Sequence, residues 1–253
     1  MKKTLELLKS KWKQERNYTF ICDQFKSLRQ DLTVQRVKSE FTVQVYETHG
    51  RIALEKADLG EYNQCQTQLK QLYNIHKLPG KTDEFVGYRI LYLIHTRNKR
   101  GIQTFYIDLM KQMEELEVHP EGDAVEHALA VRASLAQGNY HRFFQLYHTA
   151  PNLSGYLMDL FLERERLSTL QKLCKAYRPS LPLEFVIDTC GFYPADVSNP
   201  HEKKKILADG KRWLSSVGVV TDGVDLDCKA SSQGIAAKVQ FSSQGVDIKG
   251  QIH

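Results

Sequence analysis

Cysteine is scarce in this sequence, and its spacing excludes two kinds of small stabilised domain. The count is odd and no pair has C-x-x-C spacing; the five residues are Cys22, Cys65, Cys174, Cys190 and Cys228. A disulfide framework or a zinc cluster needs closer, paired cysteines. We therefore expect five reduced, mostly buried thiols, with neither a metal nor another cofactor.

Long apolar runs and a secretory signal are also missing. No run approaches the length of about 20 apolar residues that a membrane-spanning helix needs. The first nine residues, MKKTLELLK, lack the apolar centre of a signal peptide and have the pattern of a charged amphipathic helix. We expect no membrane partner.

Charge of one sign is only weakly in excess. The 253 residues carry a formal net charge of +5, with 26% charged and 42% hydrophobic residues. The hydrophobic share is sufficient for a folded core. A charge this small is compatible with an anionic partner but does not require one.

Catalytic motifs are missing as well. Gly80-Lys81-Thr82 resembles the end of a phosphate-binding loop, but Ile75 stands where that motif needs its first glycine. We interpret the segment as a turn before a helix that Thr82 or Asp83 caps. The nine histidines are scattered helix-face or core residues, and no G-x-S-x-G is present. We expect no catalytic residue, no small-molecule substrate and no enzymatic activity.

Helical periodicity dominates the first three-quarters of the chain. Apolar residues recur every three or four positions, which is typical of helices with one buried face. Residues 85–94 (FVGYRILYLI) are apolar almost all round and predict a buried central helix. The clearest stripes are Tyr62, Cys65, Leu69, Leu72 and Tyr73; Ile102, Phe105, Tyr106, Leu109, Met110, Met113 and Leu116; and Leu167, Leu170, Leu173, Cys174 and Tyr177.

A weak internal repeat indicates how these helices are arranged. Residues 57–62 (ADLGEY) resemble residues 135–140 (LAQGNY), and their glycines, Gly60 and Gly138, are 78 residues apart. This spacing fits two helical hairpins of roughly 35–45 residues each, with glycine ending one helix in a left-handed cap. We therefore predict a mainly α fold in which residues 1–179 form a right-handed, TPR-like stack of helical hairpins.

The pattern changes after Pro179. Residues 183–190 predict a short helix, and residues 200–214 predict a second one. Two β-prone runs, 217–220 and 224–228, then flank Asp222-Gly223, which is a strong hairpin signal. Helix, helix and hairpin in this order predict a winged helix over residues 180–229. Residues 230–253 are rich in Ser, Gln and Gly and predict a flexible tail or an added edge strand.

Basic residues of this C-terminal region are candidates for nucleic-acid contact. A winged helix commonly presents its second helix and its wing to a phosphate backbone, where Lys and Arg gain affinity by releasing counterions. The alternative is an ordinary solvated helix face. The candidate residues are Lys203, Lys204, Lys205, Lys211, Arg212 and Lys229.

Three stretches carry a resemblance to a known family. Residues 27–35 (SLRQDLTVQ), 45–55 (VYETHGRIALE) and 61–69 (EYNQCQTQL) are similar to segments of the Sac-three/GANP family of mRNA-export scaffolds. The resemblance implies a PCI domain, in which a helical stack ends in a winged helix. Within the first stretch we expect structural roles, with Arg29 pairing internally and Asp31 or Thr33 capping a helix.

The same resemblance implies partners and a location. It implies a heterodimer with a second PCI-domain protein through the winged helices, a small acidic Sem/DSS-type protein on that partner, and a nuclear complex that handles mRNA, with RNA or DNA on the basic surface. The alternative is a purely protein-binding scaffold of a proteasome-lid-like or signalosome-like assembly. The implied partner-binding residues are Leu181, Leu183, Phe185, Trp213, Val217, Val219, Val220 and Leu226.

Overall fold

The described part of the chain is mainly helical. The computed structural model describes residues 2–97, 104, 107, 123–194, 197 and 199–242. Most of the predicted helix over residues 102–116 and the last eleven residues of the predicted tail therefore lie outside the described residues. The elements are α1 (Lys2–Glu15), α2 (Tyr18–Val34), α3 (Glu40–Glu55), α4 (Leu59–Asn74), α5 (Thr82–His95), α7 (Asp123–Gln137), α8 (Tyr140–His148), α9 (Ser154–Ala176), β1 (Ser180–Pro182), α10 (Leu183–Thr189), α11 (Pro200–Val217), β2 (Asp225–Asp227) and α12 (Cys228–Ser242).

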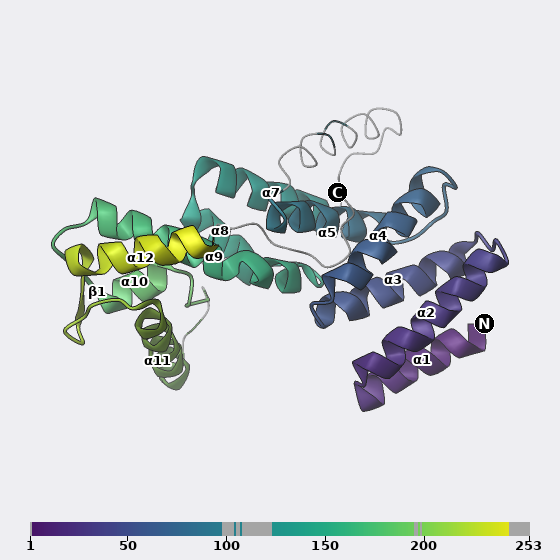
Figure 1. Cartoon of the computed structure of the whole chain (residues 1–253), viewed down its shortest axis with the longest axis horizontal. Coiled ribbons are helices and arrows are strands. Elements are labelled where there is room, and N and C mark those ends of the chain that lie inside the picture. The colour runs from purple at the N-terminus through teal and green to yellow at the C-terminus, as the bar shows by residue number, and fades with distance from the viewer. Residues whose placement is uncertain are drawn as a thin grey trace.

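The helices follow one another along the length of an elongated molecule. Helices α1 to α3 lie at one end, α4 to α8 in the middle, and α10 to α12 at the other end, with α9 joining the last two regions (Figure 1). No described helix is long and apolar enough to span a membrane.

The described residues form three apolar cores along this axis. One lies among α1, α2 and α3, the central one among α3 to α9, and the third under the C-terminal elements. Helix α5 is buried almost all round, from Phe85 to Ile94, as its apolar sequence predicts. Among the described elements it packs chiefly against α7 and α9, and it also contacts α4 and α3.

Short polar residues begin several helices. Asn17, Ser39, Asp58 and Asn139 each accept a hydrogen bond at their side chain from the backbone N–H three residues later. This is the usual way to satisfy the free amides of a first helical turn.

The internal repeat is present, but with a register that differs from the sequence prediction. Gly138 has φ of +70° after α7, whereas Gly60 lies inside α4, and Ala57, with φ of +55°, takes the left-handed position after α3. Asp58 and Asn139 follow as equivalent N-caps. The structural offset from Ala57 to Gly138 is thus 81 residues, and the assignment of Gly60 to a left-handed cap was wrong. The reason is that a single left-handed residue costs only about 1–2 kcal/mol, which tertiary packing outweighs.

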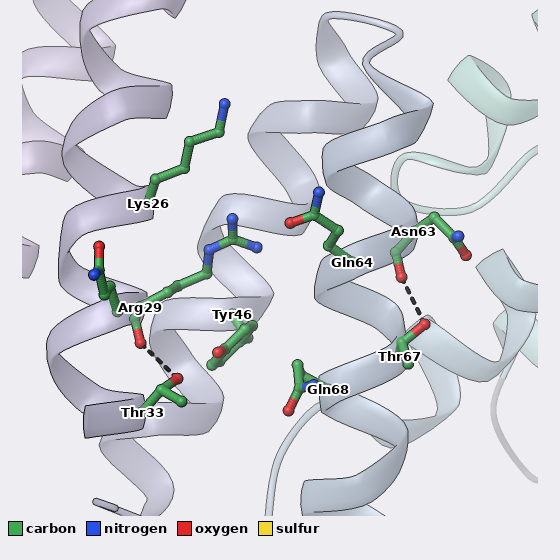
Figure 2. A pocket seen from close by; sticks show the side chains of 9 residues that line it. Lys26, Arg29, Thr33, Tyr46, Asn63, Gln64, Thr67 and Gln68 are labelled. Carbon is green, nitrogen blue, oxygen red and sulfur yellow. Dashed lines mark hydrogen bonds between the residues drawn. The ribbon is translucent and has the colours of Figure 1, made fainter. Parts of the chain in front are cut away.

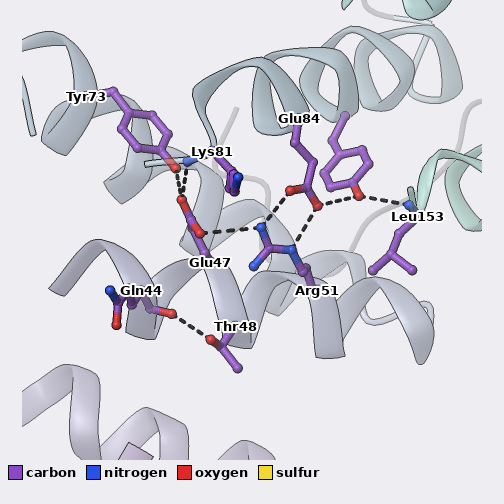
Figure 3. Close-up of polar contacts among 9 residues, drawn as sticks. Gln44, Glu47, Thr48, Arg51, Tyr73, Lys81, Glu84 and Leu153 are labelled. Atoms are coloured by element: carbon purple, nitrogen blue, oxygen red, sulfur yellow. Dashed lines mark hydrogen bonds and ion pairs between the residues drawn. The ribbon is translucent and has the colours of Figure 1, made fainter. Parts of the chain in front are cut away.

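A partly buried polar network fixes the central helices relative to one another (Figure 3). The Arg51 guanidinium donates to both carboxylate oxygens of Glu84, at 2.8 and 2.6 Å, and Tyr88 donates to the same carboxylate at 2.7 Å. Burial opposes ionisation of Glu84, but the hydrogen bonds from Arg51 and Tyr88 outweigh it and lower the pKa of its carboxyl group. The Tyr88 hydroxyl also accepts the backbone N–H of Leu153, so the network connects α3, α5 and the start of α9.

The same network explains the turn before α5. A carboxylate oxygen of Glu47 accepts the Tyr73 hydroxyl at 2.8 Å and the Lys81 backbone N–H at 2.6 Å. Lys81 occupies the N-cap position of α5 and makes no side-chain cap. The prediction that Thr82 or Asp83 caps this helix was therefore wrong, because a carboxylate from another helix satisfies the amide instead.

The C-terminal region departs from its predicted boundaries. Residues 228–242 form helix α12, which packs along α9, so the prediction of a flexible tail or edge strand was wrong for residues 230–242. Cys228, Ser231 and Ile235 are buried at helical spacing. The third core also includes the second half of α9, from Leu167 to Cys174, so this region draws on residues before position 180.

Candidate partner and nucleic-acid interface

Two short strands and two helices form the centre of the C-terminal region. Strand β1 pairs with β2 in antiparallel register, with Leu181 opposite Leu226 and both side chains buried. Helices α10 and α11 lie between the two strands along the sequence. They approach closely at Gly210, where a Cβ atom would come within 2.6 Å of the Ile187 side chain. The sequence prediction of two helices here is confirmed, with α11 reaching Val217.

The turn before β2 is a small hairpin. Thr221 bridges to Leu226 in antiparallel fashion, and Gly223 has φ of +97°. The Asp222 carboxylate accepts the backbone N–H groups of Val224 and Asp225, and these hydrogen bonds lower its pKa. The predicted hairpin around Asp222-Gly223 is thus confirmed in a shorter form. The first predicted strand over 217–220 was wrong at Val217, which belongs to α11.

The six predicted nucleic-acid-binding residues are all exposed. Lys203, Lys204 and Lys205 lie in the first two turns of α11, where the helix dipole does not stabilise cations. Two others are partly engaged, because Lys211 donates to the Gly223 carbonyl at 3.4 Å and Arg212 pairs with a neighbouring aspartate. The sixth, Lys229, is in the first turn of α12.

The eight predicted partner-binding residues separate into buried and exposed groups. The prediction was wrong for Leu181, Leu183, Val217 and Leu226, which are at most 5% exposed and form the core under the two strands. Alternating apolar residues near a hairpin point either inward or outward, and packing decides which. Among the rest, Trp213 and Val219 are half-buried, whereas Phe185 and Val220 are 41% and 48% exposed.

The half-buried tryptophan is held within the chain. The Trp213 indole N–H donates to the Glu163 carboxylate at 2.7 Å, and its ring lies 5.4 Å from that of Phe192. These contacts tie α11 to α9, which makes Trp213 a structural residue of this region.

An apolar patch next to α10 contains one predicted partner-binding residue, Phe185, and two residues that the sequence prediction missed, Tyr177 and Val224. Tyr177, Phe185 and Val224 are 47%, 41% and 74% exposed. The rings of Tyr177 and Phe185 lie 5.9 Å apart, and the Leu183 backbone N–H donates to the Val224 carbonyl, which places Val224 beside the start of α10. We call these three residues the α10 patch. The local signal that could have suggested exposure is that Val224 follows Gly223, while Tyr177 and Phe185 lie two and three residues from a proline.

Comparison with known proteins identifies the family. The SAC3/GANP family profile matches residues 3–199, most of the chain. The chain belongs to the SAC3/GANP family. The resemblance predicted from residues 27–35, 45–55 and 61–69 is thereby confirmed.

Relatives of this SAC3/GANP chain include fungal and animal proteins. A THP3 homolog of Schizosaccharomyces pombe is 56% identical, over 100% of this chain and 60% of its own length. A leukocyte receptor cluster member 8 homolog of Xenopus laevis is 47% identical, over 91% of this chain and 27% of its own length. Protein THP3 of Saccharomyces cerevisiae is 32% identical, over 92% and 50% of the two chains. The chain thus spans 60% or less of each of these relatives.

Two of the SAC3/GANP family stretches meet in space. Arg29, from the first stretch, donates to the Glu61 carboxylate of the third at 2.8 Å and to the Cys65 sulfur at 3.2 Å. The predicted internal pairing of Arg29 is confirmed. The predicted cap is not, because Thr33 donates to the Arg29 carbonyl within α2 and the helix is capped by Asn17 and Gln35 instead.

One group of described residues in the SAC3/GANP chain has the composition of a metal site. Cys22, His49 and Glu61 are buried, and their ligand atoms lie within 4.8 Å of one another. The Glu61 carboxylate, however, already pairs with Arg29 at 2.8 Å and Lys26 at 3.2 Å. Two cations this close would repel a metal ion. We therefore assign the group a structural role.

Proposed function

We propose that this chain is a non-enzymatic PCI scaffold subunit of a nuclear complex that processes, exports or surveys mRNA. Family membership carries the proposal, since the matched profile covers most of the chain. In this proposal β1, α10, α11 and the hairpin that ends in β2 form the winged helix, and the helices before them form its TPR-like right-handed stack. Such a scaffold acts by presenting surfaces to partners.

The partner in this proposal is a second PCI-domain protein that carries a small acidic Sem/DSS-type protein. The α10 patch, together with Val220, supplies exposed apolar side chains on the winged helix. A soluble protein rarely leaves such neighbouring apolar groups uncovered without a binding role. This surface replaces the four buried residues of the sequence prediction.

RNA or DNA contact is assigned to the exposed face of α11. Lys203, Lys204 and Lys205 are consecutive, exposed and without an ion pair among the described residues. Clustered cations of this kind bind a phosphate backbone through counterion release rather than by reading sequence.

A purely protein-binding scaffold is the second candidate function. It is favoured by the pairing of Arg212 with Asp209, which removes part of the positive charge of α11. In this reading the lysines of α11 contact acidic partner proteins.

Charge reversal separates the two candidates. Anisotropy of a labelled single-stranded RNA is measured with the chain alone and with its PCI partner, across a salt series. Changing Lys203, Lys204 and Lys205 to Glu is expected to abolish salt-sensitive binding while the heterodimer stays intact. Unchanged RNA binding by this variant would refute the α11 surface, and no binding by any form would favour the protein-only scaffold.

The heterodimer is tested separately by co-purification. The double variant Phe185→Asp/Val224→Asp is expected to lose the PCI partner, because a charge in a buried apolar contact is strongly unfavourable. Leu7→Asp is the matched control, since Leu7 is 56% exposed on α1, far along the chain. Retention of the partner by the double variant would show that the α10 patch is not the interface.

A further inference from the structure

A polar groove lies between α2 and α4, at the opposite end of the molecule from α11. Its larger part has a volume of about 440 Å³, and a second part of about 140 Å³ adjoins it. The two parts share Thr33, Tyr46 and Gln68. Figure 2 shows Lys26, Arg29 and Thr33 on one wall, Gln64 and Gln68 on the other, and Tyr46 of α3 at the floor.

All the formally charged residues that line this groove in the described part of the chain are cations. They are Lys26 and Arg29 in the larger part and Arg36 and Lys38 in the smaller part, and neither lining contains a carboxylate. Lys26 and Arg29 pair with Glu61, which lies outside the lining. Arg36 and Lys38 are exposed and form no ion pair with described residues. The groove therefore carries a positive charge that its own walls do not neutralise.

Amide and hydroxyl side chains supply the rest of the lining. Gln64, Gln68 and Gln71 recur on α4 at helical spacing, so they form a row along one wall. Gln30 and Thr33 of α2 stand opposite. Such groups both donate and accept hydrogen bonds, as a polar chain with hydroxyl groups requires.

We propose that this groove, the α2–α4 groove, binds the sugar–phosphate backbone of single-stranded RNA. The inference rests on the proposed function in an mRNA complex and adds a second contact to it. Arg36 and Lys38 take phosphates, and the glutamine row takes ribose 2′-hydroxyls, which both donate and accept. RNA bound here and on α11 would follow the length of the scaffold.

The lining favours RNA over a peptide. Protein-binding grooves gain most of their affinity from apolar anchors that enter open apolar pockets. Of the apolar lining residues, Leu32, Tyr46 and Leu72 are only 1%, 6% and 6% exposed, and Val37 is half-buried. A polyanion needs no such anchor, because its affinity comes from counterion release.

The groove is also suited to one strand rather than two. The Arg29–Glu61 ion pair, with N and O atoms 2.8 Å apart, joins α2 directly to α4. A double helix is far wider than a gap that a single arginine side chain spans, so it cannot enter the groove. Of the rings that line the described groove, Tyr46 is buried and His76 is half-buried, so weak sequence preference is expected.

The test is anisotropy of labelled single-stranded RNA and DNA of mixed sequence with the whole 253-residue chain. Arg36→Glu/Lys38→Glu removes the phosphate contacts, and Gln64→Ala/Gln68→Ala removes the hydroxyl contacts. Lys3→Glu/Lys13→Glu, at exposed positions on α1, is the control with an identical change of charge. Circular dichroism checks that each variant is folded.

Loss of two single-strand phosphate contacts is expected to reduce the slope of log Kd against log salt by about 1.4. Binding at 0.1 M salt should then weaken about 25-fold, the value that this slope gives over one decade of salt concentration. The α1 control should stay within about twofold. The glutamine variant should lose the preference for RNA over DNA while its salt slope stays the same.

The outcomes separate this inference from the proposed function. If the groove variants bind RNA as the control does while the α11 variant does not, the groove inference is overturned and the proposed function stands. If the groove variants lose binding of labelled polyglutamate but not of RNA, the groove inference is overturned, and the groove is a site for an acidic peptide. If the slope of log Kd against log salt falls in the groove variant and falls further when the α11 changes are combined with it, the result supports two contacts on one RNA strand.

Discussion

Stability of this protein should depend on pH through one buried histidine. His49 is fully buried on α3, stacks on Phe25 with ring centroids 5.1 Å apart, and has no hydrogen-bond partner at either ring nitrogen among the described residues. Burial, followed by the positive charges of Arg29 and Lys26, lowers its pKa to about 3. Asp58 acts in the opposite direction but does not offset these effects.

The sign and the size follow from proton linkage. An unfolded chain has a histidine pKa of about 6.5, so between pH 6.5 and pH 3 the unfolded state binds one more proton at His49 than the folded state. Stability is therefore lost as the pH falls below 6.5. Each pH unit within this window costs about 1.4 kcal/mol, which gives about 2 kcal/mol between pH 7.5 and pH 5.

The assay is urea denaturation at pH 7.5, 6.5, 5.5 and 5 for the wild type and for His49→Leu. Leucine keeps the site apolar and removes the titrating group. Burial also lowers the pKa values of His95, His127 and His148, so both proteins share that part of the pH dependence. The difference in unfolding free energy between the two proteins should change by about 2 kcal/mol over this range. Parallel curves, within about 0.5 kcal/mol, would refute a buried neutral His49.

Three further predictions concern packing, the polar network and the thiols. Gly87→Ala places a Cβ atom 2.6 Å from a backbone oxygen of α7 and should cost about 2 kcal/mol or more, whereas Gly155→Ala, with nothing within 4 Å, should be neutral or stabilising in thermal unfolding. Arg51→Met removes the cationic partner of Glu47 and Glu84 and should lower the free energy of unfolding by about 3 kcal/mol in urea denaturation. The exposed Arg212→Ala is the control and should cost about 0.5 kcal/mol or less. Similar losses for both variants would refute the role of the network. All five cysteines are buried and free, and burial raises the pKa of Cys190 to about 12, so the native protein should react with fewer than one equivalent of Ellman's reagent, and rapid reaction of several thiols would contradict the packing.

Local sequence determined most of the helical framework. A period near 3.6 residues marked the buried faces of α4 and α9, and an apolar run marked α5, because a helix must hide one face or all of it. Helices α10 and α11 were predicted by the same patterns, with Asn199 and Pro200 at the start of α11. Odd, unpaired cysteine spacing was sufficient to predict free thiols.

Tertiary contacts decided what lies between and beyond these helices. Residues 228–242 have the composition of a tail, yet Ile235 and two other buried residues at helical spacing pack on α9 and make α12 a helix. Strands β1 and β2 are only three residues each and pair across more than 40 positions, so no local pattern marks their register. That pairing also decides which of the nearby apolar residues face the core and which face the solvent.

The α2–α4 groove is the clearest case of this division. Lys26, Arg29 and Gln30 lie on α2, Gln64 and Gln68 lie on α4, and no local pattern in the sequence places these two helices opposite each other. Only the packing of both helices around α3, with Arg29 reaching Glu61, brings those faces together without a carboxylate on the lining. The sequence determines which face of a helix is polar, because the helical period is local. Which two faces lie opposite each other depends on how both helices pack on a third one, and that packing is a long-range property.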